Sequence, residues 1–239
     1  MKSNAKNTCA DILKQRILSM QITPGELLDE VELSQEFGIS RTPLREVIQR
    51  LCGEGYLISR KNRGALVAPM DMATLRHFFQ AAPMIYASIA RLAAENATSN
   101  DVETLKDIQI QYRKSIDDAE PAATAMLNHQ FHEQIGAIAS SAYLIPSLKR
   151  LLIDHTRIGQ VFYRATSTDE KEKIARAADQ HDQMIEAFQN NVPTQAVELT
   201  LEHWELSRGQ IEQFVAPAPL DFDLNLNSQS NKRENNRAI

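Results

Sequence analysis

Apolar residues recur with the spacing of amphipathic helices along the last two thirds of this 239-residue chain. From residue 71 onward they repeat at intervals of three and four residues, with few glycines or prolines between them. This pattern predicts helices over residues 71–98, 100–118, 120–139, 141–163, 167–190 and 194–214. The links between them are short and polar, which indicates an all-α antiparallel bundle. Pro83 lies inside the first helix, where we expect a kink.

The first 70 residues contain shorter amphipathic segments. Asp29, with Glu32 three residues later, is typical of a capping box that starts a helix, and Gly38 suits the turn that ends it. We expect Thr42 to cap the next helix, with Pro43 at its first helical position. An earlier helix ends before the breaker at residues 23–25. The apolar positions are Ile12, Leu13, Ile17 and Met20 in the earlier helix, and Leu44, Val47, Ile48 and Leu51 after Pro43.

The helix after Gly38 leaves basic side chains on its polar faces, chiefly Arg41, Arg45 and Arg50. A short helix, a glycine turn and a second helix with a basic N-terminal end predict a helix-turn-helix that reads double-stranded DNA. The alternative is an ordinary helical hairpin with a solvated basic face.

Two β-favouring runs, over residues 56–59 and 65–68, flank a basic turn that contains Gly64. This arrangement predicts a hairpin. The hairpin would carry Arg60, Lys61 and Arg63 toward the DNA backbone or an adjacent minor groove. Three helices followed by a basic hairpin make a winged helix-turn-helix, so the predicted fold is mainly α, with this unit followed by the helical bundle.

Charge is distributed in a way that supports this interpretation. The whole chain has a formal net charge of −5, but residues 1–70 carry ten Lys/Arg against eight Asp/Glu, and residues 71–239 carry 16 against 23. Residues 41–63 alone hold six basic and two acidic side chains, which concentrates positive charge on the predicted DNA reader.

Composition narrows the class further. Only 6% of residues are aromatic and eight are glycine, which argues against an all-β protein. There is no run of 18 apolar residues and no signal-peptide core in residues 1–8, so we expect a cytoplasmic protein without membrane association. Cys9 and Cys52 lack metal or redox spacing, and Cys52 is interpreted as a buried small hydrophobe. Residues 217–239 are predicted to be a disordered tail.

Histidines recur inside the predicted bundle. Asn128 and His132 are four residues apart and therefore share a helical face, and two later helices carry His181 and His203. Three imidazoles and an oxygen donor match the ligands of zinc or a similar divalent metal. The alternative is a set of unrelated, partly exposed histidines. His77 and His129 are interpreted as surface residues, and the role of His155 stays open.

A metalloenzyme with a DNA-binding appendage is one rival interpretation, with Glu133 as the candidate base beside His132. Neighbouring residues diverge by about 100° on a helix, so Glu133 is expected to point away from the metal. The sequence contains no HExxH, CxxC or nucleophile-elbow motif, and no catalytic residue is assigned. A second rival is an architectural DNA-binding protein with a purely structural bundle.

Residues 24–28, 38–46 and 62–64 resemble the GntR family of bacterial transcription regulators. The resemblance implies operator contacts from Arg41, Thr42 and Arg45, with Gly64 shaping the wing. Arg50, Arg60, Lys61 and Arg63 complete the expected DNA-binding set. It also implies a homodimer on a pseudo-palindromic operator.

Residues 70–215 resemble the FCD form of the FadR-type ligand-binding domain. The D/N-x-x-x-H motif and two later histidines of that form fall on Asn128, His132, His181 and His203. The resemblance implies a divalent metal, with zinc favoured and nickel or another transition metal as alternatives. Aspartate is frequent in the family where this chain has Asn128. The amide supplies no negative charge, so the site should bind metal more weakly and depend more on an anionic effector.

The expected effector is a small carboxylate attracted by the metal. Arg157 is the candidate carboxylate clamp, and a surface ion pair with Asp154 is the alternative. Relatives often place an arginine and a glutamate where this chain has Ala81, Ala82 and Tyr86. That difference makes one pocket wall less polar and puts a sugar-acid effector in doubt. The expected organisation is a DNA-binding domain over 1–69 and an effector domain over 70–216.

Overall fold

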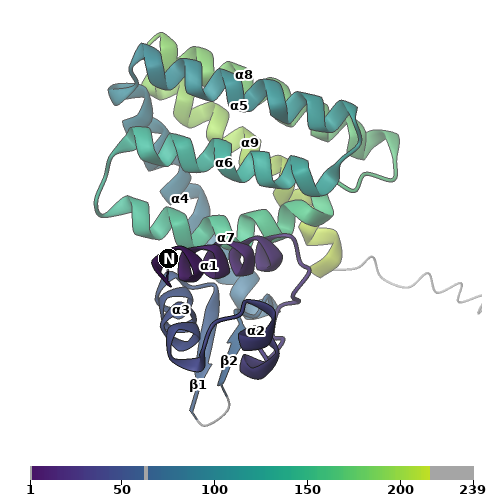
Figure 1. Cartoon of the computed structure of the whole chain (residues 1–239). Coiled ribbons are helices and arrows are strands. Elements are labelled where there is room, and N and C mark those ends of the chain that lie inside the picture. Colours follow the sequence, from purple (N-terminus) through teal and green to yellow (C-terminus); the bar gives the residue numbers. More distant parts are fainter. Residues whose placement is uncertain (1, 62–63, 216–239) are drawn as a thin grey trace, which may run out of the picture.

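The computed structural model describes residues 2–61 and 64–215 and contains a small N-terminal unit below a larger helical bundle (Figure 1). This arrangement confirms the predicted mainly-α fold. The predicted disordered tail lies outside the described residues. The small unit consists of α1 (Lys2–Leu18), α2 (Glu30–Glu36), α3 (Arg41–Glu54), β1 (Leu57–Arg60) and β2 (Gly64–Val67).

The small unit has its own hydrophobic core, into which α1, α3 and the hairpin all point apolar side chains. Leu13, Leu44, Leu51 and Val67 are almost completely buried there. Cys9 is also buried, whereas Cys52 is only partly buried, so the prediction of a buried Cys52 was wrong. The reason is that Cys52 lies at the edge of the apolar stripe of α3, next to the fully buried Leu51.

Capping in the small unit follows the sequence at one helix and departs from it at the next. The Asp29 side chain accepts hydrogen bonds from the N–H groups of Val31 and Glu32, at 2.8 and 3.1 Å, and so starts α2 as predicted. Helix α3 begins earlier than predicted, because Ser40 rather than Thr42 is its N-cap. Pro43 is therefore the third helical residue. It is tolerated there because N–H groups of the first turn have no partner within the helix.

The two strands form the predicted hairpin. They pair antiparallel, with Leu57 opposite Val67 and Arg60 opposite Gly64. Gly64 has φ +76°, a left-handed conformation that favours glycine where the second strand begins. One face of the hairpin packs on the core, and β1 runs away from the bundle toward its end at Arg60 (Figure 1).

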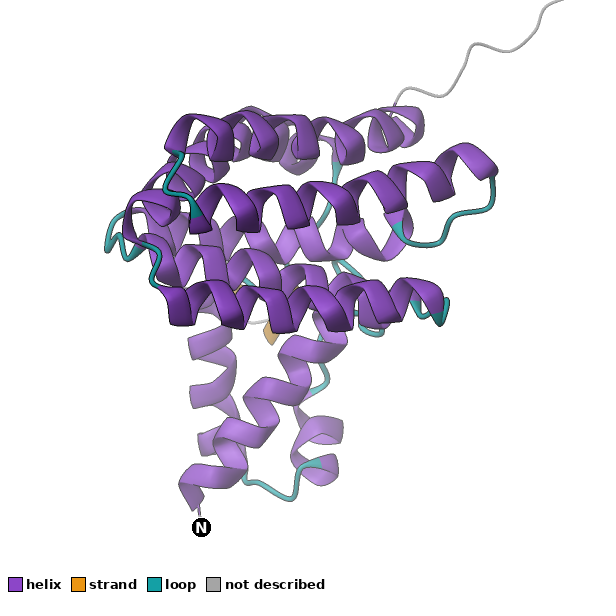
Figure 2. Cartoon of the chain, turned by 90° about the horizontal axis from the view of Figure 1, so that it is seen from above, coloured by secondary structure: helices purple, strands orange, loops and turns teal. Residues whose placement is uncertain are grey.

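The bundle elements lie within three residues of their predicted boundaries. The long helices lie alongside one another when seen from above (Figure 2). Helix α4 runs through Pro83 without interruption and packs against α6, α7, α8 and α9. Within the described residues, no helix is long and apolar enough to cross a membrane. The bundle comprises α4 (Met72–Asn96), α5 (Ser99–Asp117), α6 (Pro121–Ala139), α7 (Leu144–Phe162), α8 (Thr168–Gln189) and α9 (Pro193–Val215).

Helix α7 lies across the top of the small unit and contacts α1 (Figure 1). Its Arg150 packs over Gly55, the C-cap of α3, so closely that a Cβ at position 55 would lie 2.5 Å from the Arg150 Cδ. About two turns further along α7, Arg157 donates a hydrogen bond to the carbonyl oxygen of Ala68 at 2.6 Å. One bundle helix therefore contacts both the end of α3 and the end of the hairpin.

Candidate metal centre and nucleic-acid interface

The first turn of α3 presents the side chains predicted to contact DNA. Leu44, Val47 and Ile48 are buried against the small core, which turns Arg41, Thr42 and Arg45 outward. The Arg45 side chain is 65% exposed. A helix anchored on one face with exposed arginines at its N-terminal end has the geometry of a major-groove reader.

Arg45 is held by an acidic residue in this conformation. Its Nε lies 3.0 Å from Oε2 of Glu30, the first residue of α2. The other Glu30 oxygen lies 4.0 Å from the position that a Cβ on Gly64 would occupy. Glu30 therefore lies between α3 and the hairpin, where it neutralises part of the charge of Arg45.

The remaining basic candidates lie in different places. Arg60 and Lys61 are exposed at the end of β1, whereas Arg63 lies outside the described residues. Arg50 is nine residues beyond Arg41, or about 13 Å along the helix axis. Its Nε donates to Glu54 at 2.8 Å, so part of its charge is neutralised away from the first turn.

Three histidines from three helices of the bundle converge in its interior. His132 of α6, His181 of α8 and His203 of α9 each offer a ring nitrogen, and these nitrogens lie within 4.8 Å of one another. All three side chains are buried, with exposed fractions of 4%, 0% and 8%. The alternative of unrelated, partly exposed histidines is therefore wrong.

Hydrogen bonds to two glutamines orient two of these rings. Gln109 donates from Nε2 to the carbonyl oxygen of Ala178 at 2.8 Å, which leaves its Oε1 to accept from Nδ1 of His181 at 3.2 Å. Oε1 of Gln180 lies 3.2 Å from Nδ1 of His203. A ring that donates from Nδ1 has a lone pair on Nε2, which is the form a metal binds.

Several nitrogen and oxygen atoms of the histidine cluster have no hydrogen-bond partner in the described part of the chain, which bears on whether a metal fits between them. Nε2 of His132 and Nε2 of His181 are buried and have no hydrogen-bond partner among the described residues, and the same holds for Oδ1 of Asn128. Buried polar atoms without a partner are costly unless a ligand satisfies them. The donor set and its orientation therefore fit a divalent metal.

Electrostatics favour the neutral rings that a metal requires. Burial, reinforced by neighbouring histidines, holds the pKa of His132 and of His181 well below the ordinary value. Burial lowers the pKa of His203 to about 4. Each ring is consequently in its neutral form at neutral pH, with one N–H and one nitrogen lone pair available to a metal.

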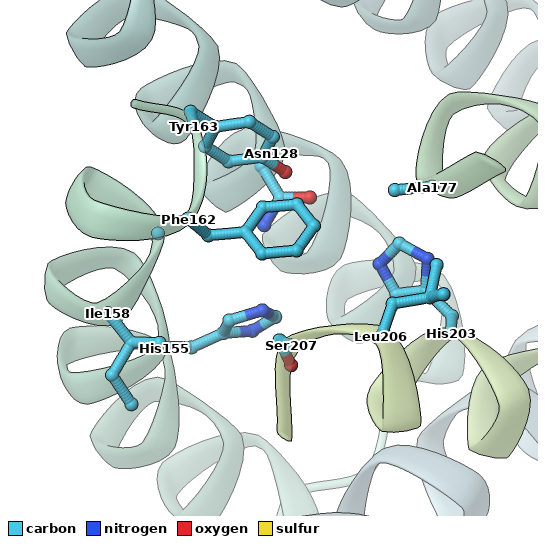
Figure 3. Close-up of a pocket in the computed structure, with 10 residues that line it drawn as sticks. Asn128, His155, Ile158, Phe162, Tyr163, Ala177, His203, Leu206 and Ser207 are labelled. Atoms are coloured by element: carbon cyan, nitrogen blue, oxygen red, sulfur yellow. The ribbon is translucent and has the colours of Figure 1, made fainter. Parts of the chain in front are cut away.

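A small pocket adjoins the cluster. The Asn128 amide and the rings of His155 and His203 face it from different helices (Figure 3). Its cavity volume is about 20 Å³, which leaves room for about one water molecule. The other lining residues are Ile158, Gly159, Phe162, Tyr163, Ala177, Leu206 and Ser207.

Sequence reasoning left His155 open, and the structure places it in this pocket. Its ring lies 5.0 Å from that of His132, centroid to centroid, and its Nδ1 is 2.7 Å from the hydroxyl of Tyr86 on α4. Gln109 and Gln180 were missed altogether. Gln109 had a detectable signal, because it is a polar residue between the buried Leu105 and Tyr112 on one face of α5.

The structure corrects two residue assignments. Arg157 does not line the pocket: it is fully buried, and its terminal nitrogens bind Asp154 and the Ala68 carbonyl oxygen. The predicted ion pair with Asp154 exists but is buried rather than at the surface, because this side of α7 faces the small unit. His129 is partly buried, with Nδ1 2.7 Å from the Thr156 hydroxyl, and so is not a free surface residue.

Glu133, the candidate base of the enzyme interpretation, is exposed on the outside of α6 while His132 next to it is buried. The expected divergence of these two side chains is confirmed. The carboxylate therefore has no access to the histidine cluster in this structure.

Comparisons with known proteins match each unit separately. Residues 5–67 match the bacterial regulatory proteins of the gntR family, and residues 78–206 match the FCD domain. The Nta operon transcriptional regulator of Aminobacter aminovorans is 29% identical over 136 residues. That match covers 56% of this chain and 63% of the relative, less than two thirds of its length.

Longer matches are more distant. The galactonate operon transcriptional repressor of Escherichia coli is 23% identical over 210 residues, which cover 80% of this chain and 89% of the repressor. The solved structure of E. coli McbR/YncC superposes with a TM-score of 0.75 at 17% identity, covering 88% of this chain and 98% of that one. With its histidine-lined bundle and its winged helix-turn-helix, this chain belongs to the GntR family of bacterial transcription regulators, in the branch that carries an FCD domain.

Proposed function

We propose that this regulator binds its operator under the control of a small carboxylate effector, which binds beside a divalent metal in the bundle. His132, His181 and His203 would hold the metal, and the Asn128 oxygen would complete the set. The observation that carries this proposal is the group of buried, unpaired ligand atoms on these residues. Zinc suits neutral imidazoles, and nickel or another transition metal could use the same ligands.

A metal held by neutral ligands keeps its positive charge and attracts a carboxylate. The chain's own residues supply the rest of the site. Burial keeps the imidazoles of His132 and His181 in their neutral form, and hydrogen bonds to Gln109 and Gln180 set the orientation of the His181 and His203 rings. Asn128 adds an oxygen without a charge, so the site stays more positive than one with aspartate at this position.

On the DNA side, Arg41, Thr42 and Arg45 would contact base edges in the major groove. Arg60 and Lys61, together with Arg63, would contact the backbone from the wing, and Arg50 would reach at most a phosphate. Two copies of the chain, as a cytoplasmic homodimer, would bind half-sites about one helical turn apart.

Helix α7 provides a physical connection between the two sites. It carries His155 in the pocket, Arg157 against the end of the hairpin and Arg150 against the end of α3. Between the two arginines lies Asp154, 3% exposed, which binds both. A ligand that shifts α7 would move both contacts to the DNA reader, and a coupling free energy of about 1–3 kcal/mol is enough for regulation.

The test is operator affinity measured with the metal present and after its removal, in the wild type and in His132→Ala. We expect metal removal to abolish any carboxylate effect on operator binding in the wild type. His132→Ala should bind operator without responding to metal or carboxylate. A carboxylate response that persists in metal-free wild-type protein would contradict the proposal.

A further inference from the structure

We infer that His155, oriented by Tyr86, is the hydrogen-bond donor that receives the effector carboxylate, and that the apolar side chains lining the pocket select an acid with an apolar body. This inference rests on the proposed function, because it places the carboxylate beside the metal. It goes further by naming the donor and the chemical class of the ligand.

The contact with the Tyr86 hydroxyl favours one tautomer of His155. The Tyr86 side chain is 4% exposed, and its hydroxyl is 2.7 Å from Nδ1 of His155. A buried hydroxyl needs an acceptor, and Nδ1 supplies one only when it carries no proton. With Nδ1 as the acceptor, the single N–H of the neutral ring is on Nε2. That N–H is the donor left for the pocket.

No stronger donor is available in the pocket. Among the described residues that line it there is no arginine or lysine. Arg157 binds Asp154 and Ala68 instead. The carboxylate would therefore bind through the metal and His155, with the Asn128 amide as a further neutral donor that faces the pocket.

Apolar side chains form a wall of the pocket beside the histidines. Ile158, Phe162 and Leu206 belong to it, and Figure 3 shows Phe162 between Asn128 and His155 and Leu206 next to His203. The Tyr163 hydroxyl is 2.8 Å from the hydroxyl of Tyr112, which already supplies it with a partner. A ligand hydroxyl placed against this wall would lose water and gain few hydrogen bonds.

The pocket has room for about one water molecule, so an acid that enters it must displace side chains such as Phe162 and Leu206. An apolar body fits this environment, whereas a polyhydroxy acid does not. A pocket of this kind discriminates by about 10- to 100-fold between a methyl group and the hydroxyl that replaces it. This places the ligand in a different class from galactonate, whose operon one of the relatives controls.

Trp204 provides a readout that is independent of DNA binding. It is the single tryptophan of the chain and follows His203 directly. Its ring is 5.9 Å from that of Tyr86 and 6.2 Å from that of His155, centroid to centroid. Binding next to these rings should therefore change Trp204 fluorescence.

The experiment titrates the full-length, zinc-loaded protein with pentanoate and with 4-hydroxybutyrate, and follows Trp204 fluorescence. The two acids have the same chain length, and a terminal hydroxyl replaces a terminal methyl. We expect pentanoate to bind at least tenfold more tightly. Equal affinity, or tighter binding of 4-hydroxybutyrate, would overturn the assignment of the apolar wall.

His155→Phe tests the donor, and zinc content is measured in the same samples. We expect zinc to be retained and pentanoate affinity to fall at least tenfold. Tyr86→Phe keeps the aromatic ring but removes the hydroxyl that favours the Nε2–H tautomer of His155, so it should cause a smaller loss of pentanoate affinity. This variant provides the test if His155→Phe does not fold. His129→Ala is the matched control, a bundle histidine outside the pocket, and should bind pentanoate like the wild type.

The outcomes separate this inference from the proposed function. Loss of zinc from His155→Phe would make His155 a metal ligand and overturn its role as donor. Unchanged pentanoate affinity in both His155→Phe and Tyr86→Phe would overturn it as well. If the wild type binds pentanoate through His155 without zinc, the inference stands and the proposed metal role fails.

Discussion

The helix-turn-helix, called the DNA reader, and the histidine-lined pocket of the bundle use polar side chains in opposite ways. The reader exposes its arginines on a helix whose other face is buried, and Arg41 and Arg45 lie within five residues of each other. The pocket buries its polar groups and assembles them from four helices, from Asn128 to His203. The residues of the DNA reader are close together in the sequence, so a local motif can reveal them. The residues of the pocket are far apart in the sequence and come together only when the helices pack.

The buried ion pair between Asp154 and Arg157, on the helix that joins the two regions, should give the largest change in stability when it is mutated. Arg157→Met removes the partner of a buried carboxylate, and we expect a loss of about 3 kcal/mol in the free energy of unfolding, measured in urea. Asp154 keeps its contact with Arg150, at 2.8 Å, which limits the loss. The double variant Asp154→Leu/Arg157→Met should be less destabilised than Arg157→Met alone. A double variant that is the less stable of the two would refute this account of the buried pair.

The reader should show two distinct kinds of mutational effect. Arg45→Ala should reduce the preference for operator over random duplex by roughly 10- to 100-fold, because one bidentate base contact is worth about 1–3 kcal/mol. Lys61→Ala should weaken every duplex equally and lower the salt dependence by about one phosphate contact. Fluorescence anisotropy at several salt concentrations measures both. Full discrimination in Arg45→Ala would show that α3 does not read the bases.

Asn128 provides a test inside the pocket. If its oxygen binds the metal, Asn128→Asp adds a negative ligand, so metal affinity should rise and pentanoate affinity at saturating zinc should fall or stay level. If it does not, the new charge is buried without a partner and should destabilise the fold by about 1–3 kcal/mol. Zinc titration alongside thermal unfolding distinguishes the cases. Unchanged zinc affinity with a lower Tm would remove Asn128 from the ligand set.

The smallest effect concerns Glu30. Glu30→Gln removes the ion pair that holds Arg45, and we expect duplex affinity to increase by up to about fivefold, since partly exposed pairs contribute about 0–1 kcal/mol. Glu32→Gln is the matched control, because it lies in the same first turn of α2 without that ion pair. Equal effects of the two variants would indicate a general charge effect rather than release of Arg45.

The accuracy of the sequence predictions follows this contrast between local and assembled sites. The wing, the stripe of α3 and the capping by Asp29 depend on neighbouring residues and were predicted correctly. The start of α3 was misplaced by two residues, because either Ser40 or Thr42 has the chemistry of a cap. The convergence of three histidines was confirmed as a geometric cluster, although the bundle topology was needed to show it.

Residue roles that depend on long-range packing were not predictable. Arg157 and Ala68 are 89 residues apart, Tyr86 and His155 are 69 apart, and Gln109 and His181 are 72 apart. An arginine three residues from a potential partner, such as Arg157 after Asp154, is interpreted as part of a surface ion pair until the element that covers it is known. Sequence periodicity can show that α7 buries a face, but it cannot show that this face meets the end of the wing.

The most direct test of the central claim is the metal content of the purified protein, measured by inductively coupled plasma mass spectrometry after loading with zinc. The account predicts one tightly bound zinc per chain in the wild type and in the control variants Glu133→Ala and His129→Ala. It predicts loss of that zinc in the triple variant His132→Ala/His181→Ala/His203→Ala. Stoichiometric zinc in the folded triple variant would contradict the claim that these histidines form a metal centre.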